Sequence, residues 1–259
     1  MFAFLLSLTT GALLYAEGDT APKRRYPISN SDRPFTLPSE IAEIDLLATH
    51  TSASSLGASI LTSYGITDNF QVNAGYDGVA LLDFETVEAE QSFHVGFDYF
   101  LFESRFVSSM VDFDFPLYVN NNVAQNLKLA LPTSIPLWRA AKLGLTILNS
   151  GLVDFIFVPY VGADINLPAR IGWQATEGLS LGLGTNLATF NINKPDGNGG
   201  YLGNAYIWTV TPLYLHALYG FQDSFDLNAR IGFHDLQRNV GNNFYVWFGI
   251  NVRFGKMTS

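Results

Sequence analysis

Hydrophobic and polar residues alternate along most of the chain from residue 40 onward. In the segment 225–234, every second residue is apolar, whereas the residues between them are polar, charged or glycine. The segments 70–78, 93–99 and 179–187 repeat this alternation. Because successive side chains of a strand point to opposite faces of a sheet, the pattern predicts β-strands throughout this part of the chain.

The two faces of the predicted strands differ in a way that favours a membrane barrel over a soluble sheet. The polar face is rich in Gly, Asn and Ser and poor in the Lys and Glu that a water-exposed face normally carries. The predicted strands run about 10–14 residues, which is long for a globular protein and suits a tilted bilayer crossing. A β-sandwich or a lipocalin-type barrel would bury its apolar face instead. We therefore predict an all-β fold, a transmembrane antiparallel up-and-down β-barrel with lipid outside and a polar lumen inside.

The composition supports this prediction and excludes several functions. Hydrophobic residues make up 48% of the 259 residues and charged residues only 14%. Beyond the N-terminus no apolar run approaches the ~18 residues of a membrane-spanning helix. The chain has no cysteine, which excludes disulfides and thiolate metal sites, and its net charge of −9 argues against nucleic-acid binding. No metal and no cofactor is expected.

The alternating segments and the turns between them predict the number of strands and their direction. The predicted strands are 41–50, 56–66, 69–82, 91–103, 105–119, 124–137, 152–165, 168–176, 178–191, 203–219, 224–236 and 242–254. This makes twelve, an even number, as is required if both ends of the barrel lie in the periplasm. The proline-containing region 131–149 leaves ten or fourteen strands open, since it could hold a helical excursion or an additional pair of short strands.

Short and long connections alternate between these strands. Three tight turns, at 65–70, 175–179 and 220–225, have the style of periplasmic turns. Longer polar stretches at 83–90, 120–122, 191–203 and 237–243 would then be extracellular loops.

The N-terminal part of the chain is expected to lie outside the barrel. Residues 1–16 have the apolar run and small final residue of a signal peptide, although the usual positive start is missing. The alternative is a strand or plug segment that stays in the mature protein. Residues 17–39 are polar and contain four prolines, which excludes a central strand and predicts a periplasmic leader. The barrel would then span 40–254, followed by a short tail over 255–259.

The last predicted strand carries a motif that resembles the C-terminal insertion signal of bacterial outer-membrane proteins. Gly249, Val252 and Phe254 match its glycine, hydrophobic and terminal aromatic positions, although five residues follow Phe254. The resemblance implies that the barrel-assembly machinery binds this strand during insertion. Over residues 40–254 the chain resembles the small porin-like barrels of Gram-negative bacteria. That implies an outer-membrane location, with lipids and lipopolysaccharide around the barrel.

The charged residues of the polar face are the candidate functional residues. The predicted lumen-lining set is Asp77, Asp98, Asp112, Asp114, Asp226, Arg230 and Arg253. Charged groups away from bulk water must be paired or hydrated, which leaves two alternatives. The first is a narrow acidic channel for passive diffusion of small polar or cationic solutes. The second is a closed structural barrel whose lumen is filled by charge pairs.

The sequence does not favour an enzyme. His50 and Ser52 have the His-x-Ser spacing of outer-membrane phospholipases, and alternation places both on one face of the first strand. No Asn or Asp is evidently placed to orient His50, and Ser52 begins a Ser-rich turn. We therefore expect a polar strand end and no enzymatic activity, with a lipid hydrolase as the second alternative. The sequence does not indicate whether subunits associate.

Overall fold

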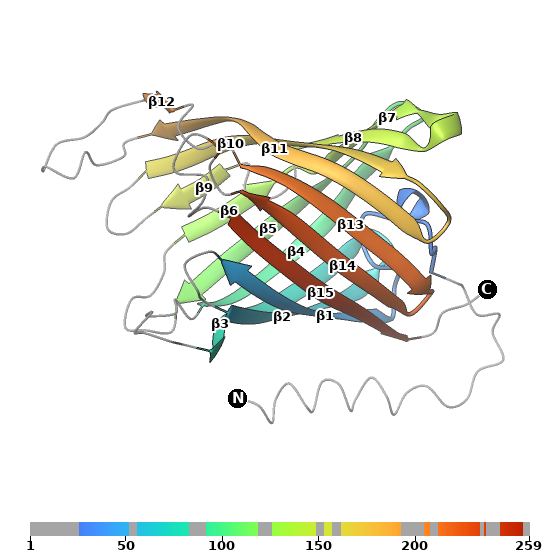
Figure 1. The fold of residues 1–259 in the computed structure, drawn as a ribbon, viewed down its shortest axis with the longest axis horizontal. Coiled ribbons are helices and arrows are strands. Elements are labelled where there is room, and N and C mark those ends of the chain that lie inside the picture. Colours follow the sequence, from blue (N-terminus) through green and yellow to red (C-terminus); the bar gives the residue numbers. More distant parts are fainter. Residues whose placement is uncertain are drawn as a thin grey trace, which may run out of the picture.

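The fold is a closed β-barrel. The computed structural model describes residues 26–51, 56–82, 92–118, 126–148, 153–156, 162–192, 205–207, 212–233, 236 and 244–255. Their strands form one antiparallel sheet that curls round until its first and last strands pair (Figure 1). The predicted all-β, up-and-down barrel is thus confirmed. In the described part of the chain, no helix has the length and apolar character needed to cross a membrane.

The strands follow one another along the chain, with two single turns of 3-10 helix, η1 (Asn30–Asp32) and η2 (Arg139–Ala141). Their bounds are β1 (Ile41–Thr51), β2 (Leu56–Thr67), β3 (Phe70–Leu82), β4 (Ser92–Glu103), β5 (Ser108–Tyr118), β6 (Asn126–Ala130), β7 (Thr133–Trp138), β8 (Leu143–Ile147), β9 (Val153–Ile156), β10 (Gly162–Gln174), β11 (Leu179–Ile192), β12 (Ala205–Ile207), β13 (Leu213–Gln222), β14 (Phe225–Phe233) and β15 (Phe244–Gly255).

These fifteen segments occupy twelve positions around the barrel, because three strands are interrupted. Both β6 and β7 pair with β5, and both β8 and β9 pair with β10. In the same way β12 and β13 both pair with β11. Each of these couples therefore makes one strand of the barrel. The predicted count of twelve is confirmed, and the alternatives of ten and fourteen are excluded.

The predicted strand bounds between residues 131 and 176 were wrong. The prediction made 152–165 and 168–176 two strands, whereas β8 and β9 form one interrupted strand and β10 runs through Pro168. Pro132 falls between β6 and β7, where its missing N–H costs no ladder hydrogen bond. Pro168 falls at a bulge of β10, which relieves the same constraint. The prolines therefore interrupt strands here without ending them.

The outer face of the barrel is apolar. The large hydrophobic side chains that the structure leaves exposed on alternate strand positions include Leu46, Val72, Val95, Phe115, Ile171, Leu183, Leu215, Leu227, Ile231, Phe248 and Ile250. The residues between them point inward and are mostly polar, as in membrane barrels. Among them Asp98 is 5% exposed, and Asp226 is fully buried.

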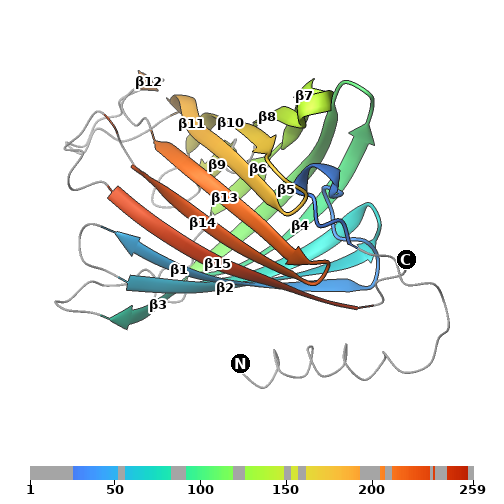
Figure 2. The same cartoon turned by 45° about the vertical axis from the view of Figure 1, so that its right-hand side comes forward.

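All the described tight turns lie at one end of the barrel, which we call the short-turn end. They join β2 to β3, β4 to β5, β7 to β8, β10 to β11 and β13 to β14. The start of β1 and the end of β15 lie at this end too, since Ile41 pairs with Gly255. Residues 26–40, which precede β1, lie inside the same end, where the single turn η1 is drawn in blue (Figure 2). The turn style predicts that this end faces the periplasm.

Candidate functional site

One side of the inner face carries a cluster of carboxylates, which we call the acidic wall: Asp98 on β4 with Asp112 and Asp114 on β5. Strand register places Asp98 directly beside Asp112. The Oδ2 atom of Asp98 accepts hydrogen bonds from the side-chain amides of Gln71 at 2.5 Å and Asn73 at 2.9 Å. These amides point two donors at one buried carboxylate, so they fix its position in the wall.

A histidine is the basic partner of the acidic wall. Its Nδ1 atom lies 2.9 Å from the Oδ1 atom of Asp114. The ring also fills the space over Gly75 on β3, where any side chain would collide with it. This residue, His94, is therefore held by both neighbouring strands.

The opposite side of the inner face is basic and aromatic; we call Arg170, Arg230, Tyr214 and Trp247 the basic wall. The guanidinium of Arg230 lies 4.4 Å from the ring centre of Tyr214 and 5.0 Å from that of Trp247. Such cation–π contacts hold a cation without neutralising it. The Tyr214 ring lies over Gly184, where a side chain would overlap it.

The strand order sets the two walls across the lumen from each other. Twelve positions close the ring, and β4 and β5 lie half-way round it from β13 and β14. The acidic wall therefore faces the strands that carry Tyr214 and Arg230. A solute in the lumen lies between surfaces of opposite charge, and such a field orients dipolar molecules.

A third charged group closes part of the short-turn end; we call it the latch. Arg33, from the segment before β1, donates two hydrogen bonds of 2.6 Å to the two carboxylate oxygens of Asp226. Arg253 on β15 also binds Asp226, and its Nε lies 2.5 Å from a carboxylate oxygen of Glu43. The Tyr26 ring stacks on the latch, with Arg253 at 4.2 Å and Arg33 at 5.3 Å from its centre.

Polar contacts also join the same N-terminal segment to several strands around the short-turn end. The backbone N–H of Ser31 donates to the side chain of Gln174 on β10 at 3.2 Å. Lys142, between η2 and β8, lies 2.9 Å from the Oδ2 atom of Asp32. Near β3, the hydroxyl of Thr36 donates to the backbone carbonyl of Asp68 at 2.7 Å.

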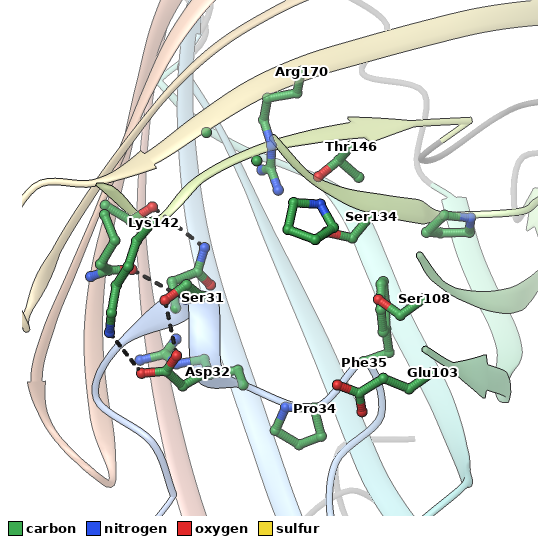
Figure 3. Close-up of a pocket in the computed structure, with 18 of the residues that line it drawn as sticks. Ser31, Asp32, Pro34, Phe35, Glu103, Ser108, Ser134, Lys142, Thr146 and Arg170 are labelled. Atoms are coloured by element: carbon green, nitrogen blue, oxygen red, sulfur yellow. Dashed lines mark hydrogen bonds and ion pairs between the residues drawn. The ribbon is translucent and has the colours of Figure 1, made fainter. Parts of the chain in front are cut away.

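A cavity of about 820 Å³ remains beside the segment (Figure 3). One side of it consists of residues 30–36, including Asp32, Pro34 and Phe35. The other side comes from β5, β7, β8 and β10, and Arg170 of the basic wall points into it from above in the view of Figure 3. The segment thus occupies part of the mouth and borders a hollow on its other side.

Two groups of the N-terminal segment have shifted pKa values. Burial raises the pKa of Tyr26 to about 12, because the phenolate would lose its hydration; the nearby Arg253 opposes the shift. Burial also acts to raise the pKa of Asp32. Hydrogen bonds from Lys142 and Ser29, together with the Lys142 charge, outweigh burial and leave the pKa of Asp32 below its usual value.

No protein-family model matches the sequence, and no curated protein is similar to it. Solved structures do resemble the barrel. A KdgM porin superposes with a TM-score of 0.55 at 13% identity, over 82% of this chain and 99% of that one. A NanC porin superposes with a TM-score of 0.53 at 10% identity, over 82% and 98%. This chain has the fold of the small porins. The resemblance predicted from the strands and from Gly249–Phe254 is confirmed at the level of fold.

The structure brings most of the predicted lumen residues into the three charged groups. Asp98, Asp112 and Asp114 form the acidic wall, Arg230 lies in the basic wall, and Asp226 and Arg253 join in the latch. Asp77 lies on β3 in register with Ser59 and Ser92, and its side chain is outside the described residues. The selectivity role of all seven stays a prediction.

Val252 and Phe254 of the insertion motif lie near the opposite end of the barrel from His50. Gly249 faces inward on β15, whereas Val252 and Phe254 lie on its outward face near the short-turn end. His50 lies exposed on the outward face of β1, near the other end. Ser52 lies outside the described residues. Within those residues, no group of three or more His, Asp or Glu side chains is arranged to hold a metal ion.

Sequence reasoning missed the role of the segment 26–40. It was predicted as a leader, and nothing in its local pattern distinguishes the latched Arg33 from a solvated arginine. One signal was available. Asp226 and the other inward carboxylates outnumber the inward arginines and lysines of the predicted strands, so the lumen lacks basic partners. This excess of carboxylates provides partners for a basic residue from outside the strands.

Proposed function

We propose that this protein is a passive diffusion channel of the bacterial outer membrane for small polar solutes. The observation that carries the proposal is a closed barrel, apolar outside, whose inner face bears charged walls and whose mouth keeps a hollow of about 820 Å³. The fold of the small porins supports it. Outer-membrane lipids and lipopolysaccharide surround the barrel, and the barrel-assembly machinery recognises β15 during insertion.

A preference for cations is the finer part of the proposal. The acidic wall holds three carboxylates, whereas two basic residues adjoin it: His94 contacts Asp114, and Lys128 on β6 lies beside Asp114 in the strand register. A ring or cluster of carboxylates lowers the energy of a passing cation and raises that of an anion. Small cationic or neutral polar solutes are therefore the expected cargo.

A second candidate cargo is an acidic saccharide, and the basic wall favours it. Arg170 and Arg230 make no ion pair with any described carboxylate, and the Nε atom of Arg230 is buried without a hydrogen-bond partner. Aromatic rings can stack on a sugar ring, while the guanidinium groups beside them can bind its carboxylate. One of the similar solved structures is described as a KdgM porin in complex with disordered oligogalacturonate, which is a saccharide of this class.

Single-channel recordings in planar bilayers test the proposal and separate the two cargoes. Under a salt gradient, cation preference gives a reversal potential of one sign, and Asp112→Asn with Asp114→Asn moves it towards zero. Anion preference gives the opposite sign, and Arg170→Gln with Arg230→Gln abolishes it. Silence of the folded wild-type protein at high concentration would refute the channel and favour the closed structural barrel.

A further inference from the structure

The barrel wall at the short-turn end is shaped to receive the N-terminal segment. At Gly220 on β13, an added Cβ atom would lie 2.7 Å from the Ile28 carbonyl oxygen and 3.1 Å from a guanidinium nitrogen of Arg33. At Gly65 on β2, it would overlap the carbonyl oxygen of Pro38. The wall thus lacks side chains at two points where the segment's backbone lies against it.

The wall also lacks the charge that the segment supplies. Around the latch, the strands contribute the carboxylates of Glu43, Asp45 and Asp226 against the single guanidinium of Arg253. Asp226 is fully buried, and a buried carboxylate is costly unless it is paired. Arg33, whose side chain is 8% exposed, adds the second guanidinium and uses both oxygens of Asp226.

The contacts of the segment span the mouth. Thr36 and Leu37 bind the β2–β3 hairpin, through the Asp68 carbonyl and the Gln71 side chain. At the other end, the side-chain amide of Asn30 donates to the hydroxyl of Ser180 on β11 at 3.5 Å. Position β3 lies half-way round the ring from β11, so the segment crosses the opening instead of following its rim.

We propose that residues 26–40 form a built-in constriction of the channel, held by the Arg33–Asp226 latch, which sets its conductance and size limit at the short-turn end. The proposal rests on the channel function proposed above. Solutes pass through the cavity between the segment and β5, β7, β8 and β10. Release of the latch lets the segment leave the mouth, which widens the opening.

Single-channel conductance of the full-length protein tests this constriction. Arg33→Ala removes the bidentate contact of the latch, and we expect the conductance to rise roughly two-fold, because a mouth without the segment is wider. Arg105→Ala is the matched control: this arginine lies in the β4–β5 turn at the same end, its side chain is exposed, and it does not line the cavity. Its conductance should stay at the wild-type level.

A reversible tether shows whether a rise in the conductance of Arg33→Ala comes from movement of the segment or from a misfolded barrel. The chain has no cysteine, so Asn30→Cys with Ser180→Cys introduces one pair at a contact that already exists. A short, cleavable thiol cross-linker on this pair should return the Arg33→Ala variant to wild-type conductance, and cleavage should raise it again. Cross-linking in the wild-type background should change nothing.

The outcomes separate the two proposals. Currents that are the same in wild type, Arg33→Ala and both states of the tethered variant overturn the constriction and leave the channel intact. Absence of current from every folded variant overturns the channel itself. A tether that blocks the wild-type current also overturns the constriction, because the segment would then have to move for conduction to occur.

Discussion

Breaking the latch should cost the barrel more stability than breaking an exposed ion pair at the same mouth. The perturbation is Asp226→Asn, which keeps the shape of the side chain and removes its charge. Asp226 is fully buried and faces two guanidinium groups, Arg33 and Arg253. Removing one partner of a buried ion pair typically costs about 3–5 kcal/mol, because the remaining charge stays buried without compensation. We expect a loss of about 3 kcal/mol, since the amide still accepts one hydrogen bond.

The assay is equilibrium unfolding of the barrel in lipid vesicles by guanidinium chloride, followed by tryptophan fluorescence. A double-mutant cycle with Arg33→Ala isolates the contact between the two side chains, and we expect a coupling free energy of about 2 kcal/mol. Asp32→Asn is the control: its partner is Lys142, the two side chains are 55% and 44% exposed, and exposed pairs contribute below about 1 kcal/mol.

Two results would refute this reasoning. If Asp226→Asn and Asp32→Asn cost the same, burial does not set the strength of the latch. If the cycle gives no coupling free energy, Arg33 and Asp226 do not interact in the membrane-embedded protein. The contact of Arg33 with the barrel wall then does not hold the N-terminal segment in place.

Three further predictions concern the N-terminal segment and the last strand. Gly220→Ala should destabilise the barrel and weaken docking of the segment, whereas Gly57→Ala, whose Cβ would meet nothing within 4 Å, should leave the unfolding midpoint unchanged. The pKa of Tyr26 is raised from 10.0 to about 12, so its contribution to stability is complete below pH 10 and is lost as the pH rises towards 12. The unfolding midpoint should therefore fall across this pH range in the wild-type protein, and fall less in Tyr26→Phe. Phe254→Ser should slow insertion into membranes by purified barrel-assembly machinery, whereas removal of residues 256–259 should not; equal rates would contradict a role for the motif.

The fold was predictable because strand alternation is a local property. In a segment such as 225–233, the polarity of each side chain indicates which face of the sheet it occupies. The strand can therefore be predicted without knowing which strands pair with it. The error between 131 and 176 includes a predicted break before Pro168, where β10 in fact continues. Whether Pro168 ends a strand depends on whether its missing N–H falls at a bulge, which the pairing with β11 decides. That information is not local.

The candidate site was predictable only in part. The inward carboxylates follow from the same alternation, so Asp98, Asp112, Asp114 and Asp226 were found together with Arg230 and Arg253. Their grouping into opposed walls depends on barrel closure, which sets β4 and β5 across from β13 and β14. The contact of Arg33 with Asp226 joins residues 193 positions apart, and no periodicity in the sequence indicates it.

The latch also lies across the seam of the barrel. The first and last strands, β1 and β15, meet there, and Arg253 on one of them pairs with Glu43 on the other. Arg33 precedes β1 in the chain yet binds Asp226 on β14, on the far side of that seam. These contacts therefore link the two ends of the barrel sheet from within the lumen. A lateral opening between β1 and β15 towards the lipid would have to break them. The contacts that narrow the mouth thus also stabilise the closed barrel in the bilayer.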